Sequence, residues 1–137
     1  MPLTSLERAK QQYLEQQVAS ASPERLLTLL YDRLLVDIDR AGAAQDAEDW
    51  SAAGTHLTHA QQIVAELSGS LTDAWDGAAD LRAVYTYVTG RLITANIGRD
   101  RLATAECREL VAPLREAWHQ AAAVTSAAAP APASALG

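Results

Sequence analysis

The sequence predicts an all-α protein, an antiparallel up-down-up-down four-helix bundle with a mobile N-terminal segment and a disordered C-terminal tail. Three observations lead to this prediction. Apolar residues recur at spacings of three and four along four stretches, each of about 20 residues. No stretch alternates polar and apolar residues for long enough to predict a β-strand. The connections between the four stretches are short, and good helix formers such as alanine, leucine and glutamine are frequent.

The first helix of the bundle is predicted over residues 23–41. Ser22 offers an N-cap hydroxyl, Pro23 suits the first helical position, and Glu24 places a carboxylate in the first turn. Gly42 is expected to end the helix in the left-handed conformation. The apolar face of this helix consists of Leu26, Leu27, Leu30, Leu34, Leu35 and Ile38.

Three more helices are predicted after the first. The second begins between Asp46 and Asp49, where a short carboxylate can cap it. The third is predicted over residues 78–97. The fourth runs from about residue 101 through residue 121, with Pro113 inside it as the site of a kink or local break. The second helix carries a narrow seam suited to bundle packing, made of Trp50, Ala53, Leu57, Ala60, Val64, Leu67 and Leu71.

The bundle is predicted to occupy residues 22–125. Residues 1–21 form a separate N-terminal segment of mixed polarity. Residues 126–137 are rich in alanine, proline and serine and offer little to bury, so they are expected to be a disordered tail.

Composition argues against several classes of protein. The chain has 137 residues, with 17 acidic against 11 basic side chains and a formal charge of −6, so it lacks the clustered basic surface that nucleic acid requires. Cys107 is the single cysteine, which is typical of a reducing compartment and leaves no disulfide framework. We expect neither a signal peptide nor a membrane span, and therefore a cytoplasmic protein with no membrane insertion.

Two histidine motifs raise the question of a metal site. His56 and His59 lie three residues apart on one flank of the second helix, but a structural zinc requires four ligands, which favours exposed histidines. Glu116 and His119 match the Glu-x-x-His motif of di-iron bundles, which those proteins need twice and this chain has once. We therefore expect no metal and no cofactor.

Nothing in the sequence predicts an enzyme. Glycine-rich phosphate loops and nucleophile-elbow serines are absent. Cys107 is interpreted as a buried thiol that packs as a small apolar side chain.

Two tyrosines on the third helix are candidates for contact with a partner. Tyr85 and Tyr87 point about 200° apart on a helix, so one faces the core and the other faces solvent or a partner. Asn96 lies near the end of the same helix and can either bind a partner or hydrogen-bond the helix end.

Several fragments, in order and with compatible spacing, extend over residues 13–122. They are Tyr13-x-x-x-Gln17-Val18-x-Ser20-Ala21-Ser22-Pro23-Glu24-x-Leu26 with Leu30-Tyr31-Asp32, then Ala60-Gln61-x-Ile63-Val64-x-Glu66-Leu67 with Ser70-Leu71, then Leu81-x-x-Val84-Tyr85-x-Tyr87 with Arg91-Leu92-x-x-Ala95-Asn96-Ile97, and finally Leu114-Arg115-Glu116-Ala117-Trp118. Together they resemble the flagellin-specific export chaperones of the FliS family. The chain departs from that family's pattern at Arg33, Val84 and Trp75.

The resemblance implies a non-enzymatic cytoplasmic chaperone for flagellar assembly. Proteins of this family bind the disordered C-terminal segment of flagellin, prevent its premature polymerisation and help to deliver it to the flagellar type III export apparatus. The first helix agrees with this role, since Leu29 and Val36 are apolar residues beyond what a four-helix core needs.

The candidate partner-binding residues follow from these fragments and from the tyrosines. They are Tyr13, Val18, Leu26, Leu30, Tyr31, Tyr85, Tyr87 and Asn96. For Leu26, Leu30 and Tyr85 a core position is the stronger interpretation. In the family the N-terminal region can lie against the bundle until flagellin displaces it, so residues 1–21 are a candidate lid.

Two other functions remain open from the sequence. One is a metal- or cofactor-binding four-helix bundle, which a metal analysis would detect. The other is an oligomerisation module based on the seam of the second helix, which chromatography with and without flagellin would separate from a chaperone.

Overall fold

Four long helices make up most of the described chain. The computed structural model describes residues 5–9 and 23–128, with side chains up to Val124. Residues 5–9 are helical, and no strand occurs in the described ranges, which confirms the all-α prediction. The long helices are α2 (Pro23–Asp46), α3 (Trp50–Gly69), α4 (Ala78–Ile97) and α5 (Arg101–Ala128).

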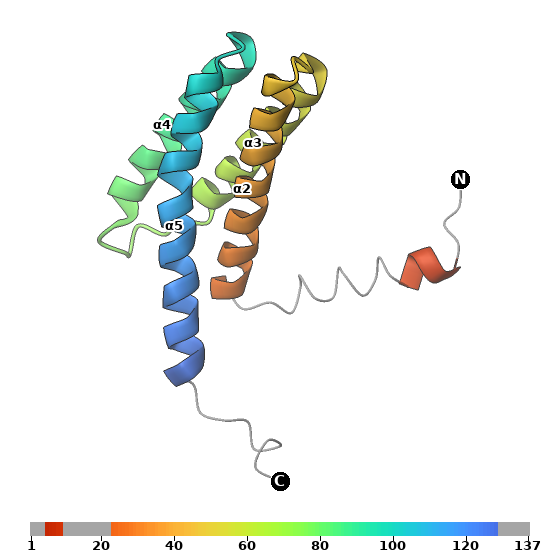
Figure 1. The fold of residues 1–137 in the computed structure, drawn as a ribbon. Helices are drawn as coiled ribbons and strands as arrows, with labels where there is room; N and C mark the ends of the chain where they lie inside the picture. Colours follow the sequence, from red (N-terminus) through yellow and green to blue (C-terminus); the bar gives the residue numbers. More distant parts are fainter. Residues whose placement is uncertain (1–4, 10–22, 129–137) are drawn as a thin grey trace.

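The four helices form an antiparallel bundle with simple connectivity (Figure 1). Helix α2 packs against α3 and α5, and helix α4 packs against the same two neighbours. Helices α2 and α4 therefore occupy one diagonal of the bundle, and their outer faces point in different directions. The last turns of α5 extend beyond the start of α2 (Figure 1).

The core is filled by the inner apolar stripes of all four helices. Each stripe repeats at spacings of three and four, as bundle packing requires. Full burial of one such leucine, isoleucine or valine stabilises the fold by roughly 1.5–3 kcal/mol. The largest fully buried apolar side chains are Tyr31, Leu34, Ile38, Leu57, Val64, Leu67, Val88, Leu92 and Val111.

Helix α2 is longer than the sequence predicts, and the role assigned to Gly42 was wrong. The helix continues to Asp46, and the left-handed residue that follows it is Glu48, with φ 56°. A β-carbon at Gly42 would lie 2.9 Å from the guanidinium carbon of Arg101 on α5. Glycine at this position therefore lets Arg101 approach α2, rather than ending the helix.

The limits of α3 and α4 and the start of α5 agree closely with the sequence. Helix α5 continues to Ala128, beyond the predicted end at residue 121 and into the predicted tail, the rest of which lies outside the described residues. The Asp49 carboxylate caps α3 by accepting a hydrogen bond from the backbone N–H of Ala52 at 3.1 Å. Helix α4 has the predicted bounds. Helix α5 does not break at Pro113, because this residue lies on the exposed face, where water can hydrate the carbonyl group that loses its donor.

Candidate partner-binding site

An exposed apolar stripe runs along the outer face of α2. Leu26, Leu29 and Val36 are 38%, 38% and 39% exposed, with Arg33 between the last two. Their spacings of three, four and three place them on one line along the helix. We call these four residues the α2 stripe. Three large apolar side chains on one exposed line form a surface of the kind that binds another protein.

A groove runs beside the α2 stripe, between α2 and α3. Its volume is about 320 Å³, and its lining comes from Leu30, Arg33, His59, Gln62, Ile63 and Glu66. Leu30 and Ile63 are apolar, whereas the other four side chains are polar or charged. Such a groove can receive an apolar side chain of a partner and hydrogen-bond the polar groups around it.

A buried carboxylate lies between α2 and α3 next to this groove. Asp37 is fully buried, and its Oδ2 is hydrogen-bonded to Nδ1 of His59. Its Oδ1 lies 3.2 Å from Nε of Arg33, a charge contact in which no hydrogen bond is made. These contacts fix Arg33 and His59, which are two of the groove's polar residues. The sequence pointed to a histidine flank but not to this partner on the neighbouring helix.

Tyr31 and Tyr85 are core residues that connect α2 to α4. Both side chains are buried, and their hydroxyl groups are hydrogen-bonded to each other. Burial raises the pKa of both phenols above the ordinary value. The Tyr31 ring also stacks on Trp118 of α5, with ring centroids 6.5 Å apart.

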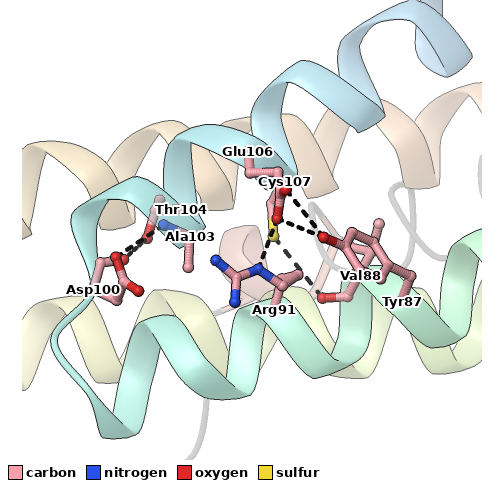
Figure 2. Close-up of polar contacts among 8 residues, drawn as sticks. All are labelled: Tyr87, Val88, Arg91, Asp100, Ala103, Thr104, Glu106 and Cys107. Carbon is pink, nitrogen blue, oxygen red and sulfur yellow. Dashed lines mark hydrogen bonds and ion pairs between the residues drawn. The ribbon is translucent and has the colours of Figure 1, made fainter.

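Tyr87 faces the opposite way from Tyr85, as the helical spacing predicts. It is 50% exposed, and its hydroxyl donates to the carboxylate of Glu106 on α5 at 3.0 Å (Figure 2). Arg91 Nε donates to the same carboxylate at 2.7 Å. The hydrogen bond to Glu106 is the main cause that raises the pKa of Tyr87.

Asn96 lies on the other side of α4 from Tyr87, next to α3. Its Oδ1 would be 3.2 Å from a β-carbon at Gly54, so glycine there allows the close approach. A polar groove of about 540 Å³ opens at this point, lined by Ser51, Gly54, Thr55, Thr58, His59, Gln62 and Asn96. The structure therefore does not bring Asn96 and Tyr87 together.

The remaining candidates divide into two groups. The core position favoured for Leu26 was wrong, because Leu26 is 38% exposed at the start of α2 and belongs to the α2 stripe. Leu30 packs against the core and lines the groove. Tyr13 and Val18 lie outside the described residues.

An ion cluster that the sequence did not predict joins α2 to the second half of α5. Asp32 Oδ1 accepts from Nε of Arg115 at 2.6 Å and lies 2.7 Å from Nε2 of His119. Partial burial raises the pKa of Asp32, but the bonds to His119 and Arg115 outweigh it, and the pKa falls below the ordinary value. His119 is therefore paired with Asp32. The carboxylate of Glu116 instead accepts a hydrogen bond from the side-chain amide of Gln120. The sequence contains one indication of this cluster, because Asp32 and Arg115 both occur in the fragments that carry the family resemblance.

Cys107 is a buried thiol, as expected. Its Sγ lies 3.9 Å from the carbonyl oxygen of Val88 (Figure 2). Burial raises the pKa of this thiol to about 12, so it carries no thiolate near neutral pH.

Within residues 5–9 and 23–128, no group of three or more His, Cys, Asp or Glu side chains is placed to hold a metal ion. None of the helices found there combines the length and apolar character needed to cross a bilayer.

A four-helix bundle with an exposed apolar stripe and an adjoining groove is typical of a protein that binds other proteins. The family model described as flagellar protein FliS matches residues 6–125. This chain belongs to the FliS family of flagellar chaperones.

Known relatives agree with this assignment, and one solved structure has a similar fold. The flagellar secretion chaperone FliS of Bacillus subtilis (strain 168) is 34% identical over 109 residues, which are 80% of this chain and 82% of the relative. The chaperone of the same name from Salmonella typhimurium (strain LT2) is 33% identical over 110 residues, 78% of this chain and 82% of that one. A crystal structure of a flagellar chaperone from bacteria matches with a TM-score of 0.67 over 83% of this chain and 94% of that chain. Its identity is 16%, so it supports the fold alone.

Proposed function

We propose that this protein is a cytoplasmic chaperone that binds the disordered C-terminal segment of flagellin in a 1:1 complex. It prevents premature polymerisation of flagellin and helps to deliver it to the flagellar type III export apparatus, without catalysing a reaction. Membership of the FliS family supports the chaperone role. The α2 stripe is the single structural observation that carries the binding mode.

The α2 stripe and its groove suit an amphipathic segment that folds as it binds. Leu26, Leu29 and Val36 offer apolar contacts along about 15 Å of helix, given a rise of 1.5 Å per residue. Coupled folding of a disordered segment typically buries about 1,000–3,000 Å² and costs roughly 2–5 kcal/mol in ordering. A client of that size would cover more than this stripe, and so would extend onto neighbouring helices.

The other candidate residues have separate roles in this proposal. Leu30 contacts the client in the groove, while the buried Tyr31 and Tyr85 support that surface from below. Tyr87 and Asn96 are contact sites on α4, on opposite sides of that helix.

The N-terminal segment is proposed as a lid that competes with the client. Tyr13, Leu14 and Val18 supply its apolar side chains. A lid that closes the site lowers the apparent affinity by the fraction of open molecules. Deletion of residues 1–16 should therefore tighten the binding of a flagellin C-terminal peptide in titration calorimetry, and an unchanged affinity would reject the lid.

Chromatography with full-length flagellin tests the proposed function. We expect a co-eluting 1:1 complex that is lost when the C-terminal segment of flagellin is removed. Binding that persists after this truncation would contradict the proposed client segment, and the absence of any complex would contradict the function.

A further inference from the structure

Helix α4 has a second apolar face, which the bundle does not use. Its inner face is buried against α3 and α5, as in any bundle helix. Its outer face carries no charged residue along its central line, from the first turn to the last, although outer faces of surface helices are ordinarily polar. This line, the outer α4 face, consists of Ala79, Ala83, Thr86, Gly90, Ile93 and Ile97, all exposed.

The outer α4 face has the spacing of a helix–helix contact. Its members follow one another at intervals of four, three, four, three and four residues, which is the a and d pattern of a coiled-coil seam. Ile93 and Ile97 are 40% and 81% exposed, at the end of the helix nearest α5 in sequence. Thr86 adds no unsatisfied polar group, because its hydroxyl already donates to the carbonyl oxygen of Arg82 at 3.0 Å.

Gly90 is a second and independent indication of a contact on this face. Glycine inside a helix lowers the folding equilibrium constant by roughly two- to fivefold relative to alanine. At Gly42 and Gly54 a side chain of the same chain lies against the glycine, the Arg101 guanidinium at 2.9 Å and the Asn96 Oδ1 at 3.2 Å from a β-carbon, and either would have to move to admit one. At Gly90 a β-carbon would meet nothing within 4 Å, and the φ angle is not positive. The bundle therefore does not explain this glycine, whereas close approach of another backbone would.

We propose that the outer α4 face binds a second copy of this chain, with the two α4 helices antiparallel about a two-fold axis between Thr86 and Gly90. The sizes of the side chains favour this occupant. In that register Ile97 faces Ala79 of the second copy, Ile93 faces Ala83, and Thr86 faces Gly90. Each large side chain thus meets a small one, and a two-fold axis makes every such contact twice.

The charges beside the outer α4 face are compatible with the same register. Asp80 comes next to Thr94 of the second copy, and Arg82 next to Asn96, so no like charges meet. On the side toward α5, Tyr87 comes next to Tyr87 of the second copy. An exposed tyrosine at the edge of a contact is favourable, because its ring buries area while its hydroxyl keeps the bond to Glu106.

This contact leaves the α2 stripe free, since α2 and α4 lie on one diagonal of the bundle and face away from each other. The inference therefore does not depend on the α2 stripe, but the second copy and the client would compete for Tyr87 and Asn96, the two client contacts proposed on α4. A single helix pair is smaller than a standard interface of roughly 1,200–2,000 Å², so the dimer should be weak and reversible, with a dissociation constant of about 10 μM to 1 mM.

Sedimentation velocity of the full chain over a range of concentrations tests the proposal. We expect the wild-type protein to shift reversibly from monomer to dimer. Gly90→Arg fits the free monomer, because the position is open, but blocks the approach of a second helix and should weaken the dimer at least about tenfold. Gly69→Arg is the matched control, because Gly69 is equally open but ends α3, and it should dimerise normally.

Disulfide trapping tests the register. In a Cys107→Ala background, a mixture of Ala83→Cys and Ile93→Cys chains should form a crosslinked dimer. Either variant alone should not, because two copies of the same residue would be about 15 Å apart along the helices, too far for a disulfide.

Three results would overturn the proposal. They are a wild-type chain that stays monomeric up to millimolar concentration, equal dimerisation of Gly90→Arg and wild-type, and efficient crosslinking of Ile93→Cys alone. If the wild-type chain is monomeric and Gly90→Arg loses flagellin binding, the outer α4 face binds flagellin and not a second copy. Normal flagellin binding in a monomeric Gly90→Arg variant would separate this proposal from the chaperone function.

Discussion

The hydroxyl groups of Tyr31 on α2 and Tyr85 on α4 are hydrogen-bonded to each other in the core. The bond crosses the diagonal of the bundle and joins the two helices that do not otherwise pack as neighbours. Each hydroxyl satisfies the other in a place that water does not reach, so both side chains depend on the pair remaining intact.

Removal of one hydroxyl should cost more than removal of both. Tyr31→Phe or Tyr85→Phe leaves a buried hydroxyl without its partner, and each should lower the free energy of unfolding by about 1–3 kcal/mol. The double variant leaves no unsatisfied group and should be more stable than the sum of the two losses predicts. Urea denaturation of the four proteins measures this coupling, and strictly additive losses would contradict it.

Three buried groups should lower the free energy of unfolding at alkaline pH. The folded state raises the pKa of Tyr31, Tyr85 and Cys107, so the unfolded chain releases these protons at lower pH than the folded chain. Their contribution is complete below about pH 8.5 and is lost as the pH rises. A Tyr31→Phe/Tyr85→Phe/Cys107→Ala variant should lose less stability between neutral pH and about pH 11. Parallel pH profiles for the two proteins would refute this explanation.

Acid should weaken the contact between α2 and the second half of α5. The pKa of Asp32 is lower when folded, so its contribution is present above the unfolded value and is lost as the pH falls through the folded one. Asp32→Asn should cost about 1 kcal/mol at neutral pH, because the pairs are partly exposed and solvent screens them.

The cost of Asp32→Asn should shrink as the pH falls below the ordinary aspartate pKa of about 3.9, and it should disappear once Asp32 is protonated in the folded chain as well. Asp39→Asn is a suitable control, since it removes a carboxylate that makes one exposed pair with Arg108 at 2.8 Å, and it should have little effect at any pH. A deficit in Asp32→Asn that persists in acid would mean that packing, and not charge, holds the two helices together.

Two glycine-to-alanine substitutions should have different effects. Gly90→Ala meets no neighbour and should stabilise the monomer by roughly 0.5–1 kcal/mol. At Gly42 the new methyl group displaces the Arg101 guanidinium, which donates to Asp46 at 2.9 Å, so the gain in helix propensity should be largely cancelled. Thermal unfolding of both variants measures the contrast, and an equal gain at the two sites would contradict the role assigned to Arg101.

The bundle could be predicted from the sequence because it depends on patterns within each helix. Apolar spacing located α3 and α4, the signals at Pro23 and Glu24 located the start of α2, and the helical repeat correctly assigned Tyr85 to the core and Tyr87 to the surface. The end of α2 was wrong, because Gly42 looks like a stop signal until the approach of Arg101 is known.

Contacts between helices could not be predicted, because they depend on the register of one helix against another. Asp37 and His59 are 22 residues apart, and Asp32 and His119 are 87 apart. No local spacing links the members of either pair. Leu29 and Val36, in contrast, were found from the excess of apolar residues on a single helix, and both are exposed.

Titration calorimetry of a flagellin C-terminal peptide against α2 variants tests the central claim most directly. We expect Leu29→Asp and Val36→Asp to weaken binding at least about tenfold each, because each removes apolar contact and places a charge in it. Leu102→Asp, which alters an 80% exposed leucine on α5, should bind like wild-type. Circular dichroism must show all three variants folded. Wild-type affinity in folded Leu29→Asp and Val36→Asp would show that the α2 stripe is not the binding surface.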